Sequence, residues 1–288
     1  MSKLKKKKAL SELTLLDRFL FDVVMEDPQN ARDILSIILG HDVGPLTVGI
    51  SERTIQPYYD GRAIRLDLLS FSDDDVIYDA EAQRSNTGSD NLQKRSRYYQ
   101  GVLDASLLLP GETDFTKLQD VFIIFIAPFD IFGKGKYVYT FRMKCDEVPD
   151  LFLNDRAVRL FLNTRGTNDN EVSAELIEFL HTTERTLTED DHEVHSDRLR
   201  DLIERIRKIK ADQKVGTRYM RYLEEKNIER AEGRAEGRAE GRDEQLISDV
   251  IGMLEEGLNP DAISRVVKRT PEEVHELIKQ FKEPASED

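Results

Sequence analysis

Cysteine is almost absent from this chain, since Cys145 is the only one among 288 residues. A single cysteine cannot form a disulfide within the chain, so we expect the fold to be held by a hydrophobic core, for which this length is sufficient. Long apolar runs are also lacking: the longest, at residues 121–129, is far shorter than the roughly 20 residues of a membrane helix. No apolar leader follows the first lysines. We therefore expect a cytoplasmic protein without a membrane partner.

Positive charge is scarce as well, because the formal net charge at pH 7 is −14. Non-specific affinity for DNA comes mainly from Lys and Arg side chains that neutralise phosphates. The acidic residues, however, are concentrated toward the C-terminus, whereas residues 5–8 and 84–97 are locally basic. DNA is therefore permitted as a partner by the charge distribution, but it is not indicated by it.

The hydrophobic period changes along the first half of the chain in an order typical of an α/β or α+β domain. Helical spacing at residues 13–39 is interrupted by Pro28, where a second helix is expected to begin. Alternation between residues 63 and 83, broken by a polar cluster at 72–75, predicts a β-hairpin. Next come a helix over 91–109, a buried strand over 121–127 and a strand over 137–143. We expect a basic tail at 1–12 and a folded core at 13–145.

The second half is expected to be helical. Residues 146–225 are highly charged and are predicted to form a helical extension. The sequence Ala-Glu-Gly-Arg then occurs three times within the segment 226–245, where helical neighbours four apart carry like charges. We expect this repeat to be a poor helix alone that either associates with a second chain or remains a solvated linker. A helical tail module over 246–288 is predicted from helix starts at Asn259-Pro260 and Thr270-Pro271.

The hairpin carries the candidate chemistry. Alternation places Asp67 on the polar face of the first strand, and Asp79, Glu81 and Gln83 on the polar face of the second. With the turn centred on Asp74, Asp67 lies opposite Glu81, and Arg65 lies opposite Gln83. Facing carboxylates destabilise a strand pair unless a cation lies between them, and Mg²⁺ is commonly held by one or two carboxylates. The alternative is a solvated polar face on a half-exposed hairpin.

Asp67 followed by Glu81-Ala82-Gln83 resembles the PD-(D/E)XK nuclease superfamily, with glutamine where lysine is usual. More narrowly, the chain resembles the Rpn family of recombination-promoting nucleases and putative transposases. The resemblance covers the helix start near residues 17–21, the hairpin, Arg95 with Tyr98-Tyr99, the segment 127–132 and the Glu-Gly-Arg repeats before a helical tail. It implies a restriction-endonuclease-like core, in which a mixed sheet is flanked by helices, with a helical C-terminal extension.

This resemblance also implies roles for individual residues. Asp67 and Glu81 become ligands of Mg²⁺ or Mn²⁺, and Gln83 takes the position at which lysine orients the attacking water. Glutamine cannot act as a base near neutral pH, so the metal is expected to activate the water. Asp22 stands where the family is expected to have a lysine.

Arg95 and Tyr99 are four residues apart on the helix after the hairpin, so they share one face. Arg95 could bind a DNA phosphate beside the aromatic hydroxyl. Alternatively, Tyr99 packs in the core and Arg95 extends to solvent. His192 and His195, which stand among carboxylates, are more simply explained as a solvated charged face than as a zinc site.

The function expected from these observations is that of a metal-dependent DNA endonuclease linked to recombination or transposition. The chain is also expected to form a homo-oligomer through the repeat and the tail. The main alternative is a non-catalytic interaction or scaffold protein of mobile-element origin. A helix-turn-helix regulator is disfavoured, because residues 243–288 contain 12 acidic and 5 basic side chains.

Overall fold

The computed structural model describes residues 8–48, 53–55, 64–66, 68–72, 76–85, 91–108, 111–187 and 194–282. For the described residues between 48 and 72, only the backbone is described. The chain divides into two compact units, Met1–Tyr219 and Met220–Asp288. None of the helices in these ranges is both long and apolar enough to cross a membrane.

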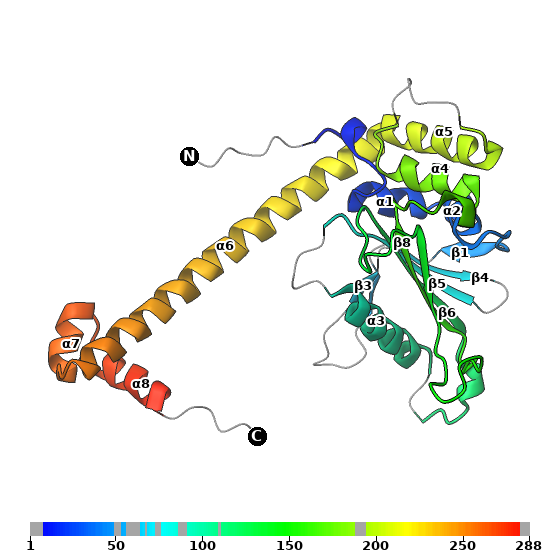
Figure 1. Cartoon of the computed structure of the whole chain (residues 1–288). Helices are drawn as coiled ribbons and strands as arrows, with labels where there is room; N and C mark the ends of the chain where they lie inside the picture. Colours follow the sequence, from blue (N-terminus) through cyan, green and yellow to red (C-terminus); the bar gives the residue numbers. More distant parts are fainter. Residues whose placement is uncertain are drawn as a thin grey trace. The chain divides into compact units, whose positions relative to one another are not determined.

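The first unit is built around a mixed β-sheet flanked by helices (Figure 1). Its six described strands lie in the order β1-β4-β5-β6-β8-β7. The three central strands β5, β6 and β8 run parallel, whereas β1, β4 and β7 pair antiparallel with their neighbours. The bounds are β1 Leu46–Val48, β4 Leu68–Ser72, β5 Val76–Ala82, β6 Asp120–Ala127, β7 Val138–Phe141 and β8 Ala157–Asn163; β2 Arg53–Ile55 and β3 Ile64–Leu66 form a separate pair.

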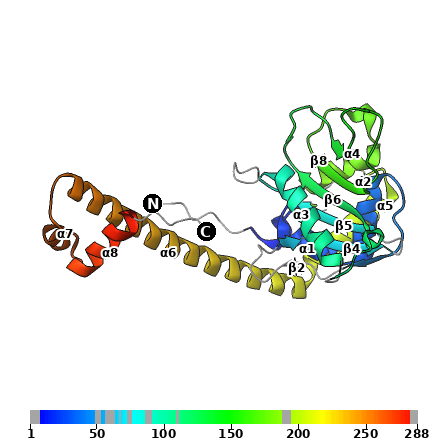
Figure 2. The same ribbon diagram turned by 90° about the horizontal axis from the view of Figure 1, so that it is seen from below.

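Helices cover both faces of the sheet, which explains why β6 is an almost continuous apolar run (Figures 1 and 2). On one face, α3 (Leu92–Leu107) packs Leu92, Tyr99 and Val102 against a cluster that includes Ile123 and Phe125 of β6. The opposite face carries α1 Arg18–Met25, α2 Pro28–Leu39, α4 Ala174–Thr183 and α5 Asp197–Ala211. Short 3₁₀ helices occur at Leu10–Glu12, Phe115–Lys117 and Asp169–Glu171.

The predicted break at Pro28 is confirmed. Pro28 occupies the first position of α2, where its missing N–H costs no hydrogen bond. Asp27 caps this helix by accepting from the backbone N–H groups of Gln29 and Asn30 at 2.9 and 3.1 Å. At the other end Gly40 adopts φ 73°, the left-handed conformation that commonly ends a helix.

The predicted hairpin and its register are also confirmed for the described pairs. β4 pairs with β5 through Leu68 and Ala80, Leu69 and Asp79, Ser70 and Tyr78, and Phe71 and Ile77. Asp67 itself lies outside the described residues. Arg65 lies in β3, where it pairs with Thr54 of β2.

The prediction of a mainly helical segment over 146–225 is wrong for residues 157–163, which form the interior strand β8. This strand pairs with β6 and β7, so the sheet continues beyond the expected end of the core at residue 145. β8 was missed because it has only seven residues and is followed by charged helices, so its apolar pattern is short compared with the helical patterns around it. Its place inside the sheet depends on pairing with β6, which is distant in sequence.

The second unit contains most of a 43-residue helix, α6 (Gln213–Glu255), followed by α7 (Pro260–Val267) and α8 (Pro271–Lys282). Both predicted helix starts are confirmed. The Asn259 side chain accepts from Ala262 N–H at 2.8 Å, and Thr270 N–H donates to Glu273 at 2.8 Å as in a capping box. Val250, Ile263 and Val274 form the core of this unit.

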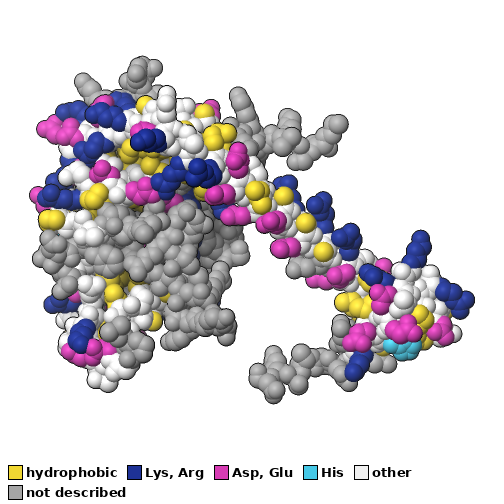
Figure 3. Space-filling model, turned by 180° about the vertical axis from the view of Figure 1, so that it is seen from behind, with side chains coloured by type: hydrophobic (Ala, Val, Ile, Leu, Met, Phe, Trp, Pro, Cys, Tyr) yellow, Lys and Arg dark blue, Asp and Glu magenta, His cyan; other side chains and the backbone are white. Residues whose placement is uncertain are grey.

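The Ala-Glu-Gly-Arg repeat lies within α6 and is helical throughout. Its described side chains are exposed, and Lys/Arg and Asp/Glu side chains are visible along the helix surface (Figure 3). Opposite charges in the repeat are two positions apart, which places them on nearly opposite sides of a helix, where they cannot pair with each other. The helix therefore presents charge that is not compensated within the repeat.

Gly166, just beyond the end of β8, allows the β8 end to lie against Tyr137. A Cβ at this position would approach the Tyr137 ring at 2.4 Å and the Tyr137 backbone nitrogen at 2.6 Å. We expect Gly166→Ala to lower the free energy of unfolding by about 1–3 kcal/mol through overpacking. The control Gly101→Ala, on α3 with open space around its Cβ, should raise it by about 0.5–1 kcal/mol. Urea unfolding of both variants measures the difference, and equal effects would contradict the steric argument.

Candidate functional site

Two acidic side chains of β5 point toward the face of the sheet that α3 covers. Asp79 and Glu81 alternate with Tyr78, Ala80 and Ala82, so both lie on the same side of the strand as Ile77. In the parallel register, Asp79 is beside Ile123 and Glu81 is beside Phe125. The predicted sharing of one face by Asp79 and Glu81 is thus found, but it is a covered face.

The solvated polar face considered as an alternative is wrong for these two residues. Asp79 is 0% and Glu81 is 1% exposed. A carboxylate buried to this degree loses its hydration, and the cost is large unless a positive charge or hydrogen-bond donors replace the water. The surroundings of Glu81 must therefore supply positive charge or donors.

Arg95 of α3 supplies that charge. Its guanidinium forms an ion pair with Glu81 and donates to the Gln83 side-chain oxygen at 3.2 Å. Its Nε donates to the Tyr99 hydroxyl at 2.8 Å. The guanidinium carbon also lies 5.1 Å from the Tyr99 ring centroid and 5.5 Å from that of Phe125, within the range of cation–π contacts. Arg95 thus contacts four residues around the end of β5: Glu81, Gln83, Tyr99 and Phe125.

The alternative predicted for Arg95 and Tyr99 is correct for one residue and wrong for the other. Tyr99 is packed in the core, with 8% exposure and a hydroxyl that accepts from Arg95. Arg95 does not simply extend to solvent, because its side chain is 27% exposed and its head group is held at Glu81. Burial, followed by the charge of Glu81, raises the pKa of Tyr99, and Arg95 acts in the opposite direction. The Tyr99 hydroxyl therefore remains protonated near neutral pH and is a hydrogen-bonding group, not a base.

Gln83 continues the pairing of β5 one residue beyond the end of the strand. Its backbone N–H donates to the Ile126 carbonyl of β6 at 2.8 Å, and its side-chain amide donates to the Ser85 carbonyl at 2.8 Å. The second bond leaves the side-chain oxygen directed to Arg95. Gln83 is therefore held by both its backbone and its side chain.

The oxygen atoms of Glu81 and Gln83 converge on one cationic group, the Arg95 guanidinium. This arrangement shows that the two side chains can hold positive charge between them, and oxygen ligands are those that Mg²⁺ and Mn²⁺ accept. Within the described ranges, no group of three His, Cys, Asp or Glu side chains is placed to bind a metal. Asp67, the other expected ligand, is outside these ranges.

No family model, curated protein or solved structure matches this chain.

Two acidic residues near the start of α1 take part in ion pairs that sequence patterns did not assign. Asp17 forms an ion pair with Arg84, the residue after Gln83, and also accepts from Thr14 N–H at 2.9 Å. Asp22, where the resemblance leads one to expect lysine, is 2% exposed and lies 3.7 Å from Arg18. Asp17 thereby ties the end of β5 to the opposite helical layer, and the only sequence signal for it is its place in the motif at residues 17–21.

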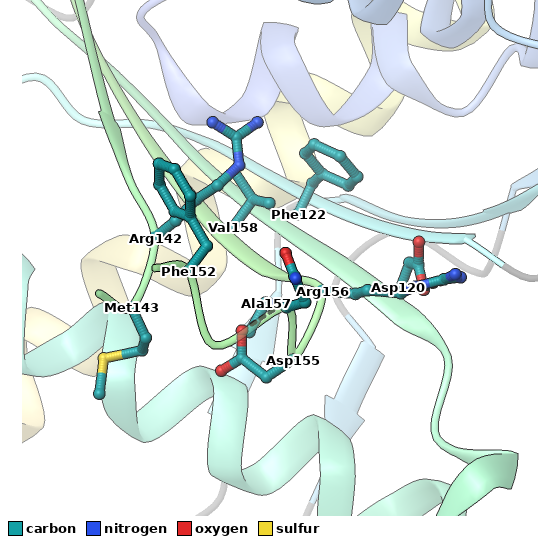
Figure 4. Close-up of a pocket in the computed structure, with 10 residues that line it drawn as sticks. Asp120, Phe122, Arg142, Met143, Phe152, Asp155, Arg156, Ala157 and Val158 are labelled. Atoms are coloured by element: carbon teal, nitrogen blue, oxygen red, sulfur yellow. Dashed lines mark hydrogen bonds and ion pairs between the residues drawn. The ribbon is translucent and has the colours of Figure 1, made fainter. Parts of the chain in front are cut away.

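Other candidate positions lie apart from this site. A cavity of about 190 Å³ at the amino-terminal ends of β6 and β8 is lined by Phe122, Arg142, Phe152 and neighbouring residues (Figure 4). Glu81 and Gln83 are toward the opposite ends of these strands. His195 contacts Glu178 at 2.6 Å and is exposed, in agreement with a solvated charged face. His192 lies outside the described residues.

The buried Arg95–Glu81 pair predicts strong energetic coupling between these residues. Arg95→Met should lower the free energy of unfolding by about 3–5 kcal/mol, because it leaves the Glu81 carboxylate buried without its cation. The double variant Arg95→Met/Glu81→Leu should recover most of that loss.

Arg165, which pairs with Glu184 and is 66% exposed, is the matched control for this experiment. Arg165→Met should cost less than about 1 kcal/mol, since solvent screens the exposed pair. Urea denaturation of the parent, Arg95→Met, Glu81→Leu and the double variant gives the coupling free energy. A double variant that is as unstable as the sum of its single changes would show that the pair is not coupled.

Proposed function

We propose that this chain is a Mg²⁺- or Mn²⁺-dependent DNA endonuclease with a restriction-endonuclease-like core of the PD-(D/E)XK type. The observation that carries the proposal is the convergence of Glu81 and Gln83 oxygens on one cation. These residues stand near the carboxyl ends of parallel strands, where α/β sheets commonly bind ligands. The described β4–β5 pairs have the register from which Asp67 was predicted to lie opposite Glu81.

In this proposal Asp67 and Glu81 hold the metal, and Gln83 orients the water through its side-chain amide. A bound divalent metal lowers the pKa of water and stabilises the charge of the leaving oxygen. Gln83 fits an orienting role, because its amide is fixed by the Ser85 carbonyl and carries no titratable proton. The neighbouring Tyr99 hydroxyl stays neutral, so its part is to position Arg95.

Arg95 and Tyr99 remain the proposed phosphate-binding pair of the site. The guanidinium lies between Gln83 and Glu81 and is partly exposed, so a phosphate bound at Gln83 would be within its reach. Arginine presents a planar fork of donors that matches phosphate oxygens. The cation–π contacts with Tyr99 and Phe125 hold that fork in place.

The scaffold alternative is favoured by one specific observation. The Glu81 charge is already compensated by Arg95, so this part of the site is stable without a bound metal. A non-catalytic relative of a nuclease could retain such an ion pair for folding alone. Metal-dependent cleavage separates the two functions.

Plasmid nicking with and without Mg²⁺ tests the proposed activity. The parent chain should nick supercoiled DNA only with Mg²⁺ or Mn²⁺, whereas Asp67→Asn and Glu81→Gln should reduce the rate by at least about 100-fold through loss of a metal ligand. Gln83→Lys should keep measurable activity, since lysine can donate the hydrogen bond to water. Arg165→Met serves as the control for preparation and folding. Full cleavage by Asp67→Asn would exclude this site.

We also propose association of two or more copies through the Ala-Glu-Gly-Arg repeat and the tail. Among the side chains that the structure describes, no acidic group is within ion-pair distance of Arg234 or Arg238, and added Cβ atoms at Gly233, Gly237 and Gly241 would meet open space. A second chain could approach this surface closely and compensate its charge.

Arg234→Glu/Arg238→Glu should weaken self-association at least tenfold in sedimentation velocity at low salt, because it reverses two of the exposed charges. The control is Lys208→Glu/Lys214→Glu, which makes the same charge change on α5 and at the start of α6. A monomeric parent chain over the whole concentration range would rule out association, and the repeat would then be a solvated helix.

A further inference from the structure

The outward side of α3 presents two cations and an aromatic ring. Lys94 and Arg97 are exposed, Tyr98 is 40% exposed, and Gly101 completes a row at positions i, i+3, i+4 and i+7. The inward side of the same helix is buried against the sheet through Leu92, Ser96, Tyr99, Val102 and Leu103. Arg95 is between these two sides, which explains why it reaches Glu81 whereas its neighbours in sequence do not.

Lys94 and Arg97 differ from several arginines on other helices of the first unit. Arg198, Arg205 and Arg218 form ion pairs with carboxylates of neighbouring segments. For Lys94 and Arg97, no acidic side chain within the described part of the chain is at ion-pair distance. In a chain with a net charge of −14, two exposed cations on one helical row form a local positive surface.

This surface lies next to the candidate site. Lys94 directly precedes Arg95, the residue that contacts Glu81 and Gln83. Arg97 is one turn further along the outer row, about 4.5 Å from Lys94 along the helix axis at a rise of 1.5 Å per residue. Long side chains at this spacing can reach neighbouring phosphates of one strand. A strand that follows the row would be directed toward the end of β5.

The local shape agrees with a ligand that has a continuous backbone. Gly101 lacks a side chain on the exposed row, and a Cβ built there meets nothing within 4 Å. Tyr98, beside Arg97 on this row, is of a residue type that contacts sugar and phosphate oxygens in DNA complexes. The row is therefore cationic, open and polar, whereas an apolar groove would be expected for a docked protein helix.

We infer that Lys94, Arg97 and Tyr98 form a surface that binds the phosphate backbone of DNA and positions it for the site at Glu81 and Gln83. This inference rests on the proposed endonuclease function. It assigns the sequence-independent contacts to the outer row of α3, whereas Arg95 serves the inner site.

The salt dependence of DNA binding tests this surface. Binding of the full chain to a fluorescent duplex is measured with Ca²⁺ in place of Mg²⁺, at several salt concentrations. Lys94→Glu/Arg97→Glu should weaken binding at least tenfold at low salt and reduce the slope of log K against log salt by about 2, since each neutralised phosphate contributes about 0.9. Arg97→Gln should reduce the slope by about 1.

Lys208→Glu/Lys214→Glu provides the control, because it changes the net charge equally on exposed residues of other helices. It should alter the slope by less than about 0.5, because it removes none of the proposed phosphate contacts. Its change in total charge acts only over long distances, where salt screens it. Circular dichroism melts confirm that each variant is folded. Equal slopes for the α3 variant and the control would overturn this surface while leaving the endonuclease proposal intact. A parent chain that neither binds nor nicks DNA would overturn both.

Discussion

The contact between Arg95 and Glu81 is the constraint on which the arrangement of the site depends. Glu81 lies in a sheet covered by α3 and is almost fully buried, so its charge must be compensated from within the protein. Arg95, on the covering helix, reaches Glu81 while bonded to Gln83 and Tyr99. This contact fixes how α3 lies over the end of β5. It also determines which residues of α3 face the site and which face solvent.

The same contact explains why the site is compatible with two different functions. An ion pair that is complete in itself stabilises the fold, and a scaffold needs nothing more. The Gln83 oxygen, however, also points to this cation, and the second hydrogen bond of its amide keeps it there. The convergence of two side-chain oxygens near the carboxyl ends of parallel strands is the observation that supports the proposed metal-dependent chemistry.

The two units use charge in different ways. In the first unit, arginines such as Arg84 and Arg205 join separate segments by pairing with carboxylates that are far away in sequence. In the repeat of α6, opposite charges are spaced so that they cannot pair along the helix, and the described side chains remain exposed. The first pattern joins segments of a folded core, whereas the second leaves the charges of the repeat exposed.

The sequence by itself determined the local elements. Pro28, Asn259 and Thr270 marked helix starts that the structure confirms, because capping depends on a few adjacent residues. Alternation and the short turn likewise determined the β4–β5 register. The sequence also grouped Asp79 with Glu81 through their shared parity on β5.

Only the tertiary structure decided what surrounds those residues. It placed β8 inside the sheet, Arg65 opposite Thr54, and Arg95 on Glu81. Burial, long-range pairing and the compensation of a buried charge depend on segments that are distant in the chain. A polar strand face therefore looks the same in sequence whether water or a helix covers it, and here α3 covers it.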